Sequence, residues 1–494
     1  MSRSAPKTDS IDIPALAEDA VALLESIIED RGVLATMDPD LRRRLLMAAG
    51  RASRPDGKAR TRLHRELRKR DKATIRAEDR AILARTGIRE LRCNPVFHTP
   101  MRQNRGAPLP PPIGEVHGER SCYCCHQAYK QVHFFYDQMC PSCGELNYRK
   151  RTPEGDLSGR VALVTGARLK IGYQAAIMLL RAGCRVIVTT RFPRDAAQRY
   201  AAEPDAADWS RRLEIHGLDL RHIPNVEALC RRLLVRHDRL DFIINNACQT
   251  VRRPPGFYQH LIDLETGPIA QLTDGERCLL GPVSEVAVLT QQAGLPAAAL
   301  SQVPLVPGDE ENSEALFPTG ALDADLQQVD LREVNSWRLR MADVPTVELL
   351  EVHLVNAVAP YLLNARLKPL MLRVPTQDKH IVNVSAMEGQ FYRTFKSDKH
   401  PHTNMAKAAL NMMTRTAALD YIKDGIHMNS VDTGWVTDED PAAHAERKRA
   451  EHNFHPPLDI VDGAARIVDP IFDGLATGKH IWGQFLKDYK ITDW

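Results

Sequence analysis

Beyond Asp156, short runs rich in valine and isoleucine alternate with segments of helical periodicity, and this alternation limits the possible folds more than any other feature. Short apolar runs of this kind are typical of strands that are buried on both faces. A chain that alternates strands with helices forms a parallel sheet covered by helices on both faces. The runs are RVALVTGA, CRVIVTTR, LEIHGLDL, LDFIINNA, KHIVNVSA and IHMNSVDT. We therefore predict an α/β domain with a doubly wound parallel sheet over residues 153–494.

One stretch interrupts this alternation. Residues 256–345 form a segment of about 90 residues with mixed polarity and several prolines, which is too long for a simple loop. We predict that it is a partly ordered insertion, either a lid or a subdomain that serves as an interaction surface.

The first hundred residues differ in periodicity and charge. Apolar residues recur at helical spacing from Ile11 to about Ile88, and between Leu41 and Cys93 the chain has 18 Arg or Lys against 6 Asp or Glu. The whole chain has a net charge of only +3, so the basic character is regional. We predict a helical, basic N-terminal region over 1–104. Such an arm suits a nucleic-acid or a protein partner, and an ordinary solvated helix face is the alternative.

A proline-rich connector over 105–117 separates this arm from five cysteines, which lie between Cys122 and Cys143. Two Cys-x2-Cys pairs stand 14 residues apart, a spacing that brings four thiolates around one tetrahedral ion. We predict a module over 118–152 that resembles a zinc ribbon and holds a structural Zn²⁺ ion. A closed site of four thiolates leaves no coordination position for a substrate. The predicted ligands are Cys122, Cys125, Cys140 and Cys143.

Cys124 is left over in this assignment, whereas His126 and His133 could each replace a sulfur. The N-terminus has no apolar signal segment, and no uncharged apolar run approaches the roughly 20 residues that span a bilayer. We therefore expect a cytoplasmic protein that is not in a membrane and whose cysteines are reduced.

The segment VALVTGARLKIGYQAAIMLL combines a strand, a glycine turn and a helix. Gly166 allows a tight turn, Gly172 allows close packing of the helix, and the free N–H groups of the helix N-terminus can bind a pyrophosphate. The segment therefore predicts a dinucleotide-binding, Rossmann-type sheet.

Several further motifs follow in order. They are TGARLKIG, Asp219-Leu220 after the third strand, NNAC from Asn245, Asn356 in VHLVNAVAPYLL, KHIVNVSA, Lys407 in AKAALNM and NSVDTGWVT. With these motifs, residues 156–494 resemble the short-chain dehydrogenase/reductase family, apart from the insertion. The resemblance implies an NAD(P)-dependent oxidoreductase that transfers a hydride. It also implies self-association, because the family commonly forms dimers or tetramers.

The resemblance assigns the cofactor contacts. Gly166, Ile171 and Gly172 would hold the pyrophosphate, whereas Lys170 replaces a glycine there and could either add a phosphate contact or crowd the cofactor. The remaining contacts would be Asp219 and Leu220 to the adenine, Asn246 and Ala247 to the adenosine side, Lys407 to the nicotinamide ribose, and Gly434 and Val436 to the carboxamide.

The second strand ends in Thr190-Arg191, where the family's NAD-binding members have a carboxylate. A guanidinium suits a 2′-phosphate, so we expect NADP, with NAD and a merely solvated Arg191 as alternatives.

The family's proton donor is missing. It is a tyrosine placed four residues before the lysine, a position occupied here by Thr403. The carbonyl-polarising serine corresponds to Ala386, with Ser385 one residue earlier. Lys407 and Asn356 remain. We expect catalysis through Asn356, Ser385 and Lys407, with Tyr392 folded back as the acid; His402 and Glu388 are weaker candidates.

The alternative is a catalytically inactive protein that senses a nucleotide or acts as a scaffold through its zinc ribbon and basic arm. The sequence does not identify the small-molecule substrate.

Overall fold

The computed structural model describes residues 12–101, 108–281, 296–310, 314–393, 396–437, 439–452 and 454–494. It divides into two compact units, Met1–Glu78 and Asp79–Trp494. This division differs from the predicted boundary at residue 104. The reason is packing: Leu83 is buried against Val116 and Val132 of the cysteine module, so the end of the arm belongs to the second unit.

The first unit consists of helices with little core. It contains α1 (Ile13–Glu29), the 3₁₀ helix η1 (Arg31–Thr36), α2 (Pro39–Ser53) and most of α3 (Gly57–Ala84), which ends in the second unit. Asp12 and Asp38 cap the first two α-helices by accepting backbone N–H bonds. Among the described residues of this unit only the Ile27 side chain is buried.

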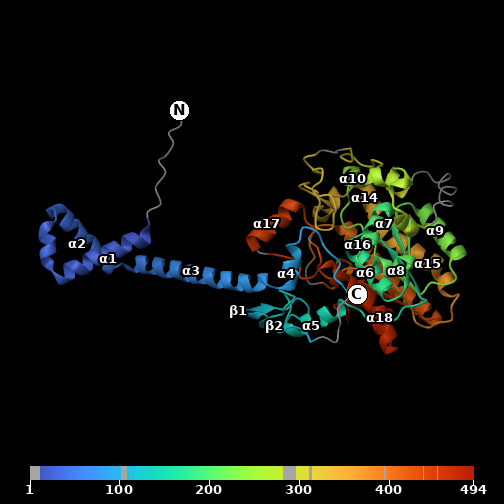
Figure 1. Ribbon diagram of the computed structural model, residues 1–494, viewed down its shortest axis with the longest axis horizontal. Helices are drawn as coiled ribbons and strands as arrows, with labels where there is room; N and C mark the ends of the chain where they lie inside the picture. Colours follow the sequence, from blue (N-terminus) through green and yellow to red (C-terminus); the bar gives the residue numbers. More distant parts are fainter. Residues whose placement is uncertain are drawn as a thin grey trace. The chain divides into compact units, whose positions relative to one another are not determined.

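The second unit, which includes the green, yellow and red parts of Figure 1, is built on an eight-stranded sheet with the order β10-β9-β8-β7-β6-β3-β4-β5. All neighbours are parallel except β9 and β10. The strands are β3 (Val161–Thr165), β4 (Arg185–Thr190), β5 (Leu213–Gly217), β6 (Phe242–Asn245), β7 (Lys379–Ser385), β8 (Ile426–Asp432), β9 (Phe485–Lys487) and β10 (Lys490–Thr492). The predicted doubly wound sheet is confirmed, and the six predicted strands are β3 to β8.

The two faces of the sheet carry separate cores. Along β3, Ala162 and Val164 contribute to one core and Val161 and Leu163 to the other, because successive side chains point to opposite faces. The helices α6 (Lys170–Arg181) and α18 (Ile460–Thr477) contribute to the first core, whereas α9 (Ile223–Arg236), α15 (Ala359–Met371) and α16 (Pro401–Tyr421) contribute to the second.

Helix α14 (Thr346–His353) continues through a π-helical turn, η6 (Leu354–Val358), into α15. By length and composition this stretch, Thr346–Met371, is the single described helix that could cross a membrane. In the structure its residues Leu363, Leu367 and Leu370 are fully buried in the second core.

The cysteine module comprises an antiparallel hairpin of β1 (Gly114–Ser121) and β2 (Ala128–Val132), followed by α5 (Pro141–Lys150). Helix α4 (Gly87–Arg92) precedes it. Strand β1 begins within residues 105–117, which the sequence suggested as a connector.

The insertion contains short helices joined by turns. They are α10 (Pro255–Thr266), η3 (Ile269–Gln271), α11 (Asp274–Leu279), α13 (Ala297–Leu300), η4 (Ser336–Arg338) and η5 (Met341–Asp343). The other elements are α7 (Pro193–Ala201), α8 (Ala206–Trp209), η2 (Ser210–Arg212), η7 (Met387–Gly389), η8 (Ile422–Asp424) and α17 (Ala442–His452).

Candidate functional site

A cleft of about 360 Å³ opens at the carboxyl ends of the central strands, where the chain order reverses on either side of β3. Parallel α/β sheets bind ligands at this point. Nine of the predicted cofactor residues line the cleft: Gly166, Lys170, Ile171, Gly172, Arg191, Asp219, Leu220, Asn246 and Ala247. The predicted residues Lys407, Gly434 and Val436 are not among its lining residues.

The two glycines of the turn are required by close contacts. Gly166 has a φ of +66°, and a Cβ atom there would lie 2.8 Å from Cα of Ala247. A Cβ atom on Gly172 would lie 2.2 Å from Nδ2 of Asn246. That amide donates to the carbonyl oxygens of Thr165 and Gly166 at 3.0 and 3.2 Å, and so fixes the turn to the end of β6. This arrangement leaves room for a phosphate group beside the N-terminus of α6.

Lys170 occupies the backbone conformation that a glycine would adopt more easily. Its φ is +55°, which costs roughly 1–2 kcal/mol for a residue with a Cβ atom. Its Nζ lies 3.8 Å from the carboxylate of Asp325 in the insertion. The side chain therefore connects the glycine turn to the insertion across the mouth of the cleft.

The walls of the cleft are mainly cationic. Six Arg or Lys residues line it against three Asp or Glu residues. Nη2 of Arg191 donates to the Tyr258 hydroxyl at 2.6 Å, and the guanidinium lies 4.5 Å from the centre of that ring. Among the described residues no carboxylate forms an ion pair with Arg191. The other five cations each form an ion pair with a carboxylate, so Arg191 is the cation of this wall that is best placed to bind an anionic ligand.

The Asp219 carboxylate already has hydrogen-bond partners within the protein. Its carboxylate accepts hydrogen bonds from Nε and Nη2 of Arg221, and Nη1 of the same guanidinium donates to Glu351 at 2.8 Å. Burial raises the pKa of Asp219, but the bonds and the charge of Arg221 outweigh this effect, and the pKa is lowered. Asp219 is therefore a charged group that positions Arg221 in the cleft wall.

Ser385, Thr403 and Lys407 are buried and are not among the residues that line the cleft. Ser385 ends β7, and the other two are one turn apart on α16, each at most 5% exposed. Nζ of Lys407 donates to the carbonyl oxygen of Val384 at 2.8 Å. The hydroxyl oxygens of Ser385 and Thr403 are buried without a hydrogen-bond partner among the described residues. Such unpaired groups are costly, so they indicate a place where a polar ligand or water can bind.

Asn356 holds the loop after β6. Its Oδ1 accepts from the backbone N–H of Gln249 at 2.8 Å, and its Nδ2 donates to the carbonyl oxygen of the same residue at 3.1 Å. The structure places Asn356 in the π-helical turn, beside the cleft residue Val355.

The expectation that Tyr392 folds back beside Lys407 is not met in this structure. Tyr392 is 86% exposed, whereas Lys407 is 5% exposed, so the phenol is in solvent and not in the buried cluster. His402, in contrast, is 1% exposed, and its Nε2 lies 3.3 Å from Oε1 of Glu348. Sequence reasoning did not single out Glu348. The available signal was a pair of carboxylates, Glu348 and Glu351, within the largely apolar stretch TVELLEVHLV.

The end of the insertion covers the loop between β7 and α16. The Trp337 ring stacks on the His400 ring with centroids 3.9 Å apart and an interplanar angle of 6°. The backbone N–H of His400 donates to the carbonyl oxygen of Leu339 at 2.7 Å. This cover lies over the segment that leads to Thr403 and limits access of solvent.

The segment after β8 forms another side of the cleft. Thr437, Glu439 and Ile460 line it. A Cβ atom on Gly463 would lie 3.0 Å from Ile171 and 3.2 Å from Val436, so these two side chains converge on one point of α18. The predicted carboxamide contacts, Gly434 and Val436, therefore lie in the segment after β8. This segment closes the cleft beyond the glycine turn.

The four predicted metal ligands meet in the cysteine module. Their Sγ atoms all lie within 4.8 Å of one another, and those of Cys125 and Cys140 are 3.7 Å apart. A tetrahedral zinc site with Zn–S bonds near 2.3 Å has S–S edges of about 3.8 Å. The backbone N–H of Cys140 donates to Sγ of Cys122 at 3.3 Å, which favours a thiolate there. The donor set and its spacing therefore fit a zinc ion.

Two neighbouring residues that could bind a metal, His133 and Cys124, form other hydrogen bonds. Nδ1 of His133 accepts from the backbone N–H groups of Phe135 and Tyr136, and Sγ of Cys124 accepts from Asn147 at 3.7 Å. Neither residue belongs to the group of four thiols.

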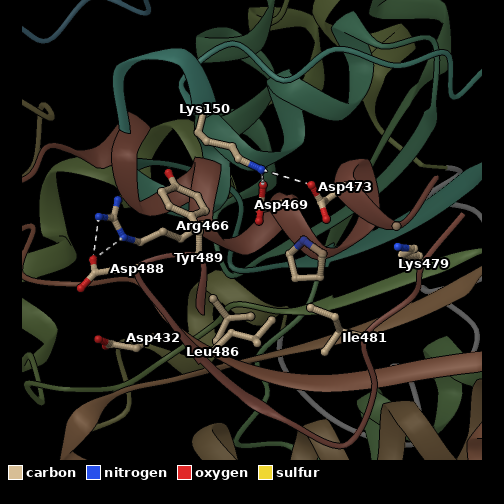
Figure 2. A pocket seen from close by; sticks show the side chains of 13 residues that line it. Lys150, Asp432, Arg466, Asp469, Asp473, Lys479, Ile481, Leu486, Asp488 and Tyr489 are labelled. Atoms are coloured by element: carbon tan, nitrogen blue, oxygen red, sulfur yellow. Dashed lines mark hydrogen bonds and ion pairs between the residues drawn. The ribbon is translucent and has the colours of Figure 1, made fainter. Parts of the chain in front are cut away.

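A second cavity of about 80 Å³ lies between α5, α18 and the β9–β10 turn (Figure 2). Two ion pairs lie in its lining: Lys150 with Asp469, and Arg466 with Asp488 at 2.9 Å. It is too small for a dinucleotide.

Comparison with known proteins gives two family matches. Residues 160–261 match the model described as short chain dehydrogenase, and residues 334–458 match the model described as Enoyl-(Acyl carrier protein) reductase. Residues 262–333 lie between these matches, inside the insertion.

An uncharacterized protein of Acanthamoeba polyphaga mimivirus is 31% identical over 370 residues, which are 72% of this chain and 71% of the viral protein. Retinol dehydrogenase 14 of Mus musculus is 34% identical over 118 residues, 21% of this chain and 35% of the enzyme. The chain therefore spans about a third of that dehydrogenase. The NADPH-bound carbonyl reductase from chicken fatty liver is 16% identical, with a TM-score of 0.42; the alignment covers 68% of this chain and all of that one.

Proposed function

The chain belongs to the short-chain dehydrogenase/reductase family, and from this premise we propose that it is an NADP-dependent oxidoreductase with an atypical proton donor. The observation that carries the proposal is the cationic cleft at the carboxyl ends of the strands, because its glycine turn and its charge fit a dinucleotide. A reduced nicotinamide in this cleft would supply a hydride to an electrophilic carbon of the substrate.

Arg191 supports NADP over NAD. Its guanidinium follows β4, where the ribose of the adenosine half would lie, and its only described hydrogen-bond partner is the neutral Tyr258 hydroxyl. A guanidinium without an ion-pair partner among the described residues suits, at this place, the two negative charges of a 2′-phosphate. Lys170 would face the pyrophosphate and would exchange Asp325 for a phosphate oxygen.

The buried pair of His402 and Glu348 supports an acid other than the missing tyrosine. His402 precedes Thr403 on the first turn of α16, and neither of its ring nitrogens has a hydrogen bond among the described residues. In reduction of a carbonyl compound, His402 would give a proton to the oxygen while the hydride adds to the carbon, and the product is an alcohol. Glu348 at 3.3 Å would stabilise the imidazolium before transfer. Lys407 would hold the nicotinamide ribose.

Turnover of NADPH against a panel of carbonyl compounds tests this proposal in four proteins: wild type, His402→Gln, Tyr392→Phe and Lys407→Ala. We expect His402→Gln to lose at least 100-fold in kcat with NADPH affinity retained, since general acid catalysis contributes roughly 10²–10⁴-fold. Tyr392→Phe is the control, and its exposed phenol predicts an unchanged rate. A large loss in Tyr392→Phe, with His402→Gln unaffected, would assign the acid to Tyr392 instead.

A catalytically inactive nucleotide sensor is the second candidate. It is favoured by the burial of the candidate catalytic residues, none of which is among the residues that line the cleft: His402, Ser385, Thr403 and Lys407. This candidate predicts NADPH binding by calorimetry and no turnover in any of the four proteins.

We propose a structural Zn²⁺ ion in the cysteine module, supported by the 3.7 Å spacing between Cys125 and Cys140. Metal analysis should find one zinc per chain. Cys125→Ser should reduce this content to less than half, whereas Cys93→Ser, which removes an exposed thiol outside the module, should not change it.

Self-association through α16 is supported by its exposed apolar residues. Met405, Met412 and Leu419 stand seven residues apart and are 54–64% exposed, so they form one apolar stripe along the helix. Light scattering should give a dimer or larger assembly, and Met412→Glu should convert it to monomer. A monomeric wild type at micromolar concentration would refute self-association.

A further inference from the structure

The cysteine module reaches the cleft through one of its own loop residues. Tyr123 lies between Cys122 and Cys124, and its hydroxyl oxygen accepts the backbone N–H of Trp435 at 2.9 Å. A Cβ atom on Gly434 would lie 3.1 Å from the same oxygen, so the two segments of the chain are in close contact. The metal-binding loop therefore fixes the backbone at the start of the segment after β8.

Other contacts hold the far end of that segment. Nε2 of Gln138 donates to the carbonyl oxygen of His455 at 2.7 Å. Nη2 of Arg92 donates to the carbonyl oxygens of Pro456 and Leu458 at 2.6 and 3.0 Å. We call residues 434–437 and 454–460 the wall segment. Its two parts are joined by the bond from the Leu458 N–H to the Trp435 carbonyl oxygen at 3.3 Å.

The module itself is anchored to α18. The Arg151 guanidinium makes two bonds of 2.8 Å to Asp459 and one of 2.8 Å to Asp462, all within buried surroundings. Figure 2 shows Lys150 of α5 directed at Asp469 and Asp473 of α18. Its Nζ lies 2.5 and 3.5 Å from their carboxylate oxygens. These ion pairs give the module a fixed base against which it can hold the wall segment.

The wall segment bounds one end of the cleft. Thr437 and Ile460 line the cleft, and Val436 packs with Ile171 of the glycine turn on Gly463. Arg191, at the end of β4, lines another part of the same cleft. A shift of the wall segment would therefore affect the nicotinamide half of a bound dinucleotide more than the adenosine half.

We propose that the cysteine module is a clamp on the wall segment, in which Tyr123 is a positioning residue for the nicotinamide half of the dinucleotide and the metal on the four thiolates keeps the clamp rigid. This inference rests on the proposed dinucleotide binding for its functional consequence. Loss of the metal would free the Cys122–Cys125 loop and, with it, the hydroxyl that holds Trp435.

The test compares the affinities of wild type and Tyr123→Phe for two ligands, NADPH and 2′,5′-ADP, which has the adenosine half alone. One hydrogen bond of ordinary strength corresponds to roughly three- to tenfold in affinity. We expect Tyr123→Phe to bind NADPH three- to tenfold more weakly and 2′,5′-ADP as wild type does. Equal losses for both ligands, or no loss for either, would overturn the clamp.

Tyr129→Phe is the matched control. The Tyr129 hydroxyl donates to the carbonyl oxygen of Asp137 at 3.2 Å, inside the same module and without contact to the wall segment. We expect this variant to bind both ligands as wild type does. A selective loss of NADPH affinity in Tyr129→Phe would overturn the role given to Tyr123.

Two further measurements separate the clamp from the proposed function. Removal of the metal from wild type with a mercurial reagent and a chelator should reproduce the selective loss of NADPH affinity; unchanged or equally weakened binding of both ligands would count against the clamp. Hydrogen exchange without nucleotide should be faster at residues 434–437 in Tyr123→Phe than in wild type. If wild type binds no dinucleotide, the proposed function fails, and the exchange rates alone decide whether the clamp exists.

Discussion

Asp432 provides a test of the electrostatics between the sheet and the cysteine module. It is the last residue of β8, it is 5% exposed, and it is paired in register with Ser385. The pKa of its carboxyl group is raised to about 6, mainly by burial; Glu388 and Asp488 add to this shift, whereas Lys487 and the Gly434 amide oppose it. Since the ordinary pKa of an aspartate is 3.8, the carboxyl group holds its proton to a higher pH in the folded protein than in the unfolded chain.

The sign of the pH effect follows from linkage. The pKa of this acid is higher in the folded state than in the unfolded state, so its contribution to stability is fully present below pH 3.8 and is lost as the pH rises through 6. At a pH where the Asp432 carboxyl group is ionised in both the folded and the unfolded protein, this pKa shift lowers the free energy of unfolding by about 3 kcal/mol. Asp432→Asn, which is always neutral, should therefore be more stable than wild type by up to about 3 kcal/mol at pH 8, and by only about 1 kcal/mol at pH 4.5.

Urea unfolding followed by tryptophan fluorescence, at both pH values and with zinc kept constant, measures this difference. Asp208→Asn is the control, because that carboxylate is exposed and should give no pH-dependent difference. The reasoning is refuted if Asp432→Asn is less stable than wild type at pH 8, or if the difference is the same at pH 8 and pH 4.5.

Three substitutions in the cleft give further tests. Lys170→Gly should raise the free energy of unfolding by roughly 1 kcal/mol, measured by urea titration, because glycine adopts a φ of +55° without strain. Arg191→Leu should weaken NADPH binding by at least tenfold and NADH binding by less than threefold in calorimetry, since only NADPH has the 2′-phosphate. Gly172→Ala should abolish measurable binding of either coenzyme, because the new Cβ atom would lie 2.2 Å from the Asn246 amide. The control Gly118→Ala, with no atom within 4 Å of its Cβ position, should bind normally.

The sheet was predictable because its signals are local. Each strand from β3 to β8 is a short apolar run, and the glycine turn at Gly166 is specified by the residues next to it. The cleft residues followed from the same segments, since the carboxyl ends of parallel strands meet at one edge. Strand β9 was not predicted, because three residues, Phe485–Lys487, are too few to show a period.

The proton donor could not be predicted from the sequence in the same way. Tyr392 was chosen because it is a phenol on the right loop, but the sequence contains no information on whether that loop turns inward. Its 86% exposure depends on how the insertion covers the neighbouring residues, with Trp337 stacked on His400. These partners are more than 60 residues apart in the chain, and no periodic pattern connects them.

The contact between Tyr123 and Trp435 illustrates why a module at one end of a chain can influence a site at the other. The two residues are 312 positions apart, and they meet where Arg151 and Lys150 also join the module to the carboxylates at and near the start of α18. A hydrogen bond from a backbone N–H to a side chain leaves no mark on the sequence around Trp435, since any residue but proline supplies that N–H group. Among the described contacts between the module and residues 434–437, the hydrogen bond of Tyr123 is the one that a single substitution can remove. Tyr123→Phe is therefore expected to loosen this part of the wall segment without unfolding the module, because Gln138 and Arg151 still hold the other part.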